Sequence, residues 1–125
     1  MLDQPSSRRV LVVEDEPLIR AAIAEELSER GFQVLEARDT SSALATLESQ
    51  PGITAVVSDI KMPGALDGED LALTVQSRYP DVRMLVLSAH EPTPVLISAA
   101  DGIIAKPTPP STVADRLKAI MDPVS

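Results

Sequence analysis

Five short apolar runs, separated by stretches with helical spacing, limit the folds open to this chain more than any other feature. Four of them are nearly continuous, which is typical of strands covered on both faces, as in a parallel sheet. A fifth run, Gln33–Ala37, is more polar and indicates an edge strand. The continuous runs are residues 10–13, 53–57, 84–87 and 103–105.

The segments between the runs carry apolar residues at the helical period and recognisable ends. Pro17 suits a first helical turn, and Gly31 suits the left-handed position that closes a helix. A second helix is predicted with Asp39 or Thr40 as its N-cap and an end before Pro51.

Two further helices are predicted, and a third segment is restricted by proline. One helix stops at Pro80, and the last has Thr108 as its cap with Pro109 in its first turn. Within residues 91–100, the prolines limit any helix to about one or two turns after Pro94. The alternation of strands and helices predicts a doubly wound, three-layer α/β domain.

The length of 125 residues fits a single domain, which we assign to residues 1–125 with a core of about 8–121. The ends are expected to be frayed. Met1 suggests a natural start, and no output domain follows Met121 in this sequence. We therefore expect a single-domain protein.

Charge and composition exclude several classes of function. The formal net charge is −8, which argues against direct binding to nucleic acid or to an anionic membrane. There is no cysteine and only His90, so thiolate zinc sites, disulfide frameworks and histidine-rich metal sites are excluded. No signal peptide or membrane-length apolar run is present, and we expect a cytoplasmic protein.

Polar side chains follow the central strands of the predicted sheet, at the edge where such folds place their chemistry. They are Glu14, Asp15, Asp59, Ser88 and Lys106. Three carboxylates so close would repel one another unless a cation neutralised them, and oxygen ligands alone favour Mg²⁺. Together with a lysine and a hydroxyl, this set suits the transfer of a phosphoryl group onto a carboxylate.

These residues and their neighbours make the chain resemble the receiver domain of two-component response regulators, over about residues 8–121. The motifs are Glu14-Asp15, Asp59 with the following Met62-Pro63 and Asp67-Gly68, Ser88-Ala89, and Lys106-Pro107. The resemblance implies a flavodoxin-like, five-stranded parallel sheet of order 2-1-3-4-5.

The resemblance also implies a role for each residue. Asp59 would be the phosphoacceptor, and Asp15 and Asp59 would bind Mg²⁺ directly. Glu14 would act through water, and the backbone carbonyl of Lys61 would complete the metal site. Lys106 would neutralise charge on the phosphoryl group.

Two further expectations concern the neighbours of the phosphoryl group. Ser88 would donate a hydrogen bond to it and move inward with its loop, and Lys106–Pro107 would be a cis peptide. The positions of Lys61 and His90 can influence how water reaches the phosphoryl group in such domains.

The chain departs from the family pattern in three places. Ile103 stands where many receivers have Tyr or Phe, so the usual coupled movement of a ring and a hydroxyl is not available. The loop at 62–68 is longer than usual, and the segment at 88–106 is shorter. The fourth helix is therefore expected to be short, displaced or partly disordered, which leaves its way of transmitting a signal open.

The function implied is that of a phosphorelay receiver, loaded by a histidine kinase or histidine phosphotransferase and read by a downstream protein. We expect a monomer or weak dimer, with no catalysis beyond its own phosphorylation and slow autodephosphorylation. The alternative is a pseudo-receiver that binds partners without phosphate. A Mg²⁺-dependent phosphohydrolase would need a second acid where Lys61 stands, and a flavodoxin-like cofactor would be repelled by residues 14–16. Taken alone, residues 14–16 are equally compatible with a solvated helix start.

Overall fold

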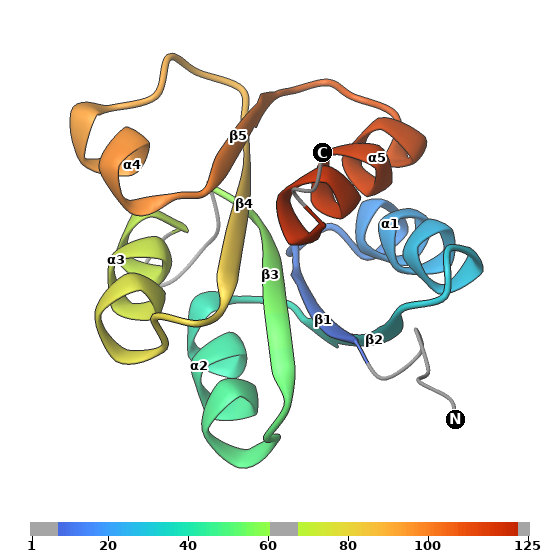
Figure 1. Cartoon of the computed structure of the whole chain (residues 1–125). Helices are drawn as coiled ribbons and strands as arrows, with labels where there is room; N and C mark the ends of the chain where they lie inside the picture. Colours follow the sequence, from blue (N-terminus) through green and yellow to red (C-terminus); the bar gives the residue numbers. More distant parts are fainter. Residues whose placement is uncertain (1–7, 61–67, 123–125) are drawn as a thin grey trace.

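The computed structural model describes residues 8–60 and 68–122, which form one five-stranded parallel sheet with helices on both faces (Figure 1). The strand order is β2-β1-β3-β4-β5, as the resemblance implies. The strands are β1 Arg9–Val13, β2 Gln33–Ala37, β3 Ile53–Asp59, β4 Arg83–Ser88 and β5 Gly102–Ala105. The helices are α1 Pro17–Glu29, α2 Thr40–Ser49, α3 Gly68–Arg78, α4 Pro94–Ala99 and α5 Pro110–Met121.

Two apolar cores lie on opposite faces of the sheet. One contains buried residues of α1 and α5, and the other contains buried residues of α2, α3 and α4 (Figure 1). The central strands β1, β3 and β4 contribute side chains to both cores. This explains their nearly continuous apolar runs and confirms the prediction of a doubly wound three-layer fold. The more polar β2 lies at an edge, as predicted.

Several helix ends follow local sequence signals. The Asp39 carboxylate caps α2 by accepting a hydrogen bond from the Ser42 N–H at 2.8 Å, and Gly31 has a φ of 97° just after α1. The expected cap of α5 was wrong. The helix begins at Pro110, and Pro109 rather than Thr108 occupies the cap position. Because a residue before proline is kept out of the helical region, Pro109 is extended and the helix starts after it.

The segment between β4 and β5 holds the short helix that the prolines predict. α4 has six residues and begins at Pro94. Ile103 of β5 is partly buried and packs against the core that includes Leu96. The Lys106–Pro107 peptide bond is cis, as expected. No helix in residues 8–60 and 68–122 has the length and apolar character needed to span a bilayer.

Candidate functional site

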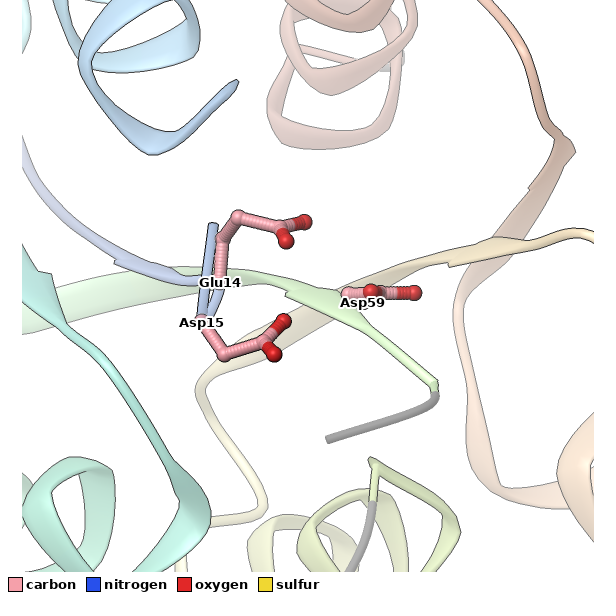
Figure 2. Close-up of side chains that lie close together, drawn as sticks. All are labelled: Glu14, Asp15 and Asp59. Atoms are coloured by element: carbon pink, nitrogen blue, oxygen red, sulfur yellow. The ribbon is translucent and has the colours of Figure 1, made fainter. Parts of the chain in front are cut away.

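The carboxylates of Glu14, Asp15 and Asp59 converge at the carboxyl ends of β1 and β3 (Figure 2). These strands are neighbours, and Val13 of β1 pairs with Ser58 of β3. The residues that follow Val13 therefore lie beside Asp59, the last residue of β3. One oxygen from each of the three carboxylates lies within 4.8 Å of the others. The sheet thus brings together the acidic residues that the sequence singled out.

Glu14 is the buried member of this cluster. Its side chain is 2% exposed, and its Oε1 atom receives no hydrogen bond from the part of the chain that the structure describes. Its Oε2 atom accepts the Glu16 N–H at 3.1 Å. Burial raises the pKa of the Glu14 carboxyl to about 7; the Glu16 N–H opposes this shift and the charge of Asp59 adds to it. A buried oxygen without a donor is a position that a cation can satisfy.

The backbone that carries Glu14 is fixed by neighbouring elements. Its N–H donates to the Ala37 carbonyl of β2 at 3.0 Å, and its carbonyl accepts from Arg20 Nη1 of α1 at 2.7 Å. Arg20 also forms an ion pair with Glu36. The sequence reasoning missed Arg20, because it considered only the apolar positions of this helix. A basic residue one turn after Pro17 was the available signal.

Among the described residues, Lys106 supplies the positive charge beside Asp59. Its Nζ lies 3.2 Å from Asp59 Oδ2, and its backbone N–H donates to the Ser88 carbonyl at 2.8 Å. Lys106 follows the end of β5, and the bond to Ser88 ties it to the end of β4. The three carboxylates and this lysine carry a formal charge of −2 between them when all are ionised. This is the charge that a divalent cation balances.

Ser88 exchanges two hydrogen bonds with the backbone of His90 in the loop that follows it. The side chain is 4% exposed, and its hydroxyl donates to the His90 carbonyl at 2.8 Å. The His90 N–H donates back to the Ser88 Oγ at 3.2 Å. For this hydroxyl to turn toward a phosphoryl group on Asp59, it must leave the His90 carbonyl. The inward movement of Ser88 stays a prediction.

Gly68 brings α3 into contact with the backbone that follows Asp59. Its N–H donates to the Ile60 carbonyl at 2.9 Å, and a Cβ at this position would lie 2.5 Å from Ile60 Cα. This close approach of two backbones requires glycine, because any Cβ at this position would collide with the backbone of Ile60. Lys61, the predicted carbonyl ligand, lies outside the described residues, as do residues 62–67 of the loop.

The donor set fits a hard divalent cation. All the side-chain ligands that converge are carboxylates, which Mg²⁺ prefers, and the orphaned Glu14 oxygen is among them. The acidic cluster and Lys106 together place three carboxylates and one ammonium group around the end of β3.

A family model of the response regulator receiver domain matches residues 10–118. The chain belongs to this family. The phosphate regulon transcriptional regulatory protein PhoB of Escherichia coli is 33% identical over 124 residues, which cover 95% of this chain and 54% of PhoB. This receiver therefore spans about half the length of the curated relatives it matches.

Solved receiver structures have the same architecture. The response regulator TrrA of Thermotoga maritima, solved in complex with Mg²⁺-BeF, is 30% identical with a TM-score of 0.81, covering 90% of this chain and 98% of TrrA. A CheY-like receiver domain of Methanospirillum hungatei has a TM-score of 0.84 at 23% identity, covering 93% of this chain and 94% of its own. The receiver fold expected from the sequence is confirmed.

Proposed function

We propose that this receiver accepts a phosphoryl group on Asp59 from a phosphohistidine, with Mg²⁺ held by Asp15 and Asp59 and, through water, by Glu14. The observation that carries this proposal is the convergence of three carboxylates and Lys106 around Asp59. The carbonyl of Lys61 remains part of the proposed metal site. The TrrA structure supports the proposal, since that response regulator, 30% identical to this chain, was solved in complex with Mg²⁺-BeF.

The proposed reaction is an in-line transfer. A carboxylate oxygen of Asp59 forms a bond to phosphorus while the bond from phosphorus to the histidine nitrogen breaks, and that nitrogen leaves with the electron pair. Bound Mg²⁺ supplies neutralisation of charge on the phosphoryl oxygens. Lys106 already lies beside Asp59 and adds a second positive charge. The Ser88 hydroxyl turns from the His90 carbonyl to donate to the phosphoryl group.

An apolar groove next to this site suits the protein that carries the phosphohistidine. Its lining includes Lys106 and Pro107 together with Leu18, Ile19 and Ala22 of α1. Leu18 and Ile19 are 81% and 41% exposed and line the groove together, and contiguous exposed apolar surface of this kind marks interaction sites. Lys106 both lines the groove and forms an ion pair with Asp59. We therefore propose that a helix of the histidine kinase or phosphotransferase docks in the groove.

The readout is proposed to be docking of a downstream protein, or onward transfer of the phosphoryl group, by a monomer or weak dimer. The formal charge of −8 disfavours direct contact of this domain with a phosphate backbone. PhoB is named as a transcriptional regulatory protein, but this chain spans about half of it.

We propose no catalytic activity beyond self-phosphorylation and slow autodephosphorylation, and a cytoplasmic location. The alternative is a pseudo-receiver that binds its partner without phosphate, which the absence of an aromatic residue at Ile103 allows.

The direct test is incubation with Mg²⁺ and acetyl phosphate, followed by intact-mass measurement. The wild type is expected to gain one base-labile phosphoryl group, and Asp59→Ala is expected to gain none. Asp101→Ala is a suitable control, because Asp101 is an acidic residue that bonds to the Met84 N–H away from the cluster. The proposal fails if neither acetyl phosphate nor phosphorylated kinases give an adduct and beryllofluoride does not bind in the presence of Mg²⁺.

The docking groove has a separate test. Ile19→Ser is expected to slow transfer from any phosphorylated histidine kinase that loads the wild type, while loading from acetyl phosphate is unchanged. Leu73→Ser is the matched control, because Leu73 and Ile19 are both 41% exposed and Leu73 lies on α3. Equal slowing by the two variants would contradict the assignment of the groove.

A further inference from the structure

α4 is joined to α3 by a side-chain hydrogen bond at each of its ends. At its start, the Thr93 hydroxyl donates to Glu69 Oε2 of α3 at 2.5 Å. At its end, Gln76 Nε2 of α3 donates to the Ser98 carbonyl at 3.0 Å. Glu69 and Gln76 are seven positions apart, which places them on the same face of α3. The two helices lie side by side, on the opposite face of the sheet from α5 (Figure 1).

The Thr93 hydroxyl also caps α4. The same hydroxyl oxygen accepts the Leu96 N–H at 3.1 Å and thereby caps the helix. A helix of six residues is unstable without its cap and its packing, and it buries only Leu96 and Ala99. The position of the Thr93 hydroxyl relative to Glu69 therefore affects both the placement and the stability of α4.

The start of α3 contacts the backbone that follows the proposed acceptor, Asp59. Gly68, the residue before Glu69, is the one whose Cβ would lie 2.5 Å from Ile60 Cα and 2.6 Å from the Asp59 carbonyl oxygen. No side chain lies between these backbones, so a displacement of the backbone after Asp59 must displace the start of α3. Packed groups in direct contact transmit such displacements because they leave no room to absorb them.

We infer that α3 and α4 move as one unit in this receiver, and that the state of Asp59 reaches α4 through Gly68, Glu69 and Thr93. This inference rests on the proposed phosphorylation of Asp59. It gives the chain a route to α4 that needs no aromatic residue at position 103. Ile103 is packed in the core and stays there, while α3 carries the change to the short helix.

The test measures amide exchange of α4 with and without Mg²⁺ and beryllofluoride. In the wild type, beryllofluoride is expected to change the exchange rates of residues 95–99. In Thr93→Val and Gln76→Glu, which each remove one bond to α3, this change is expected to fall about threefold or more. Thr93→Ser keeps both functions of the hydroxyl and should retain the wild-type response. Ser77→Ala is the matched control. Ser77 is the neighbour of Gln76, and its hydroxyl donates to the Thr74 carbonyl within α3.

Fluorine NMR of bound beryllofluoride separates the possible failures. If the wild type does not bind beryllofluoride, the proposed function is overturned together with this inference. If all variants bind it and α4 responds equally in each, the inference alone is overturned. Thr93→Val can loosen α4 by removing its cap, so Gln76→Glu, which leaves the cap in place, must give the same loss of response.

Discussion

α4 and α5 both begin at a proline and both flank β5, yet they are held in different ways. α5 has twelve residues and buries Val113, Ala114 and Leu117 against the core shared with α1. α4 has six residues, buries Leu96 and Ala99, and relies on two side-chain hydrogen bonds to α3. Fully burying one such leucine or valine contributes about 1.5–3 kcal/mol. α5 is thus part of the global core, whereas we expect α4 to unfold locally at a lower free energy, which is separate from the joint displacement of folded α3 and α4 inferred above.

The largest expected effect contrasts the two central leucines of these helices. Leu117→Ala is expected to lower the free energy of unfolding by about 2–5 kcal/mol, because Leu117 is fully buried. Leu96→Ala removes the same atoms, but much of its cost is expected as faster local exchange of α4. Denaturant unfolding and amide exchange measure the two effects. Equal losses of global stability would contradict the distinction.

Mg²⁺ is expected to slow amide exchange more in α5 than in α4. A ligand that binds only the folded protein adds about 2.7 kcal/mol at a hundred times its Kd. This protection should appear in the exchange of sheet and α5 amides, and less in α4 amides, which exchange by local opening. Asp15→Asn should weaken Mg²⁺ binding about tenfold or more by calorimetry. Glu16→Gln is the matched control, since this exposed neighbour lies outside the cluster.

Gly102 tests the contact between β5 and α5. A Cβ there would lie 2.7 Å from Ile120 Cδ1 and 3.1 Å from Leu85 Cδ1. Because the end of an isoleucine side chain can turn away, Gly102→Ala is expected to cost about 1 kcal/mol of unfolding free energy. Ile120→Val removes the colliding atom, so the double variant should lose less than the sum of the single variants. Additive losses would refute this account of the contact.

The smallest expected effect is a pH dependence at the end of α5. Arg8 bonds to the Asp122 carboxylate and holds its pKa below the ordinary value of 3.8. A lowered pKa means that this contribution to stability is present above 3.8 and is lost as the pH falls through the folded value. The difference in melting temperature between wild type and Asp122→Asn should therefore shrink below pH 3.8. A melting-temperature difference that grows as the pH falls would contradict this prediction. α4 contains no charged residue, and its own segment offers no comparable titration.

Much of the fold could be predicted because the relevant signals are local. The apolar runs mark all five strands, and the predicted meeting of Glu14 with Asp59 follows from their places at the ends of adjacent strands. The error at Thr108 arose from a competing local rule, since Pro110 forces Pro109 to be extended.

The contacts that could not be predicted join residues whose spacing carries no signal. Thr93 and Glu69 are 24 positions apart, and neither residue type indicates a partner. The Arg20 bond to the Glu14 carbonyl depends on how α1 is placed above β1, which no periodicity reveals. The roles of Asp59, Lys106 and Ser88 remain predictions, although the structure brings Lys106 to Asp59.

The hydrogen bond from Gly68 to Ile60 has a consequence for how this receiver tolerates insertion. The chain leaves the sheet after Ile60 and returns to the same point at Gly68, so the positions of both ends are set without regard to the number of residues between them. Doubling the length of a flexible loop with fixed ends costs only about 0.6 kcal/mol. We therefore expect that a tag or a fluorescent reporter inserted after the proposed carbonyl ligand Lys61 and before Gly68 would leave the hydrogen bond from Gly68 to Ile60 and the pairing of β3 unchanged.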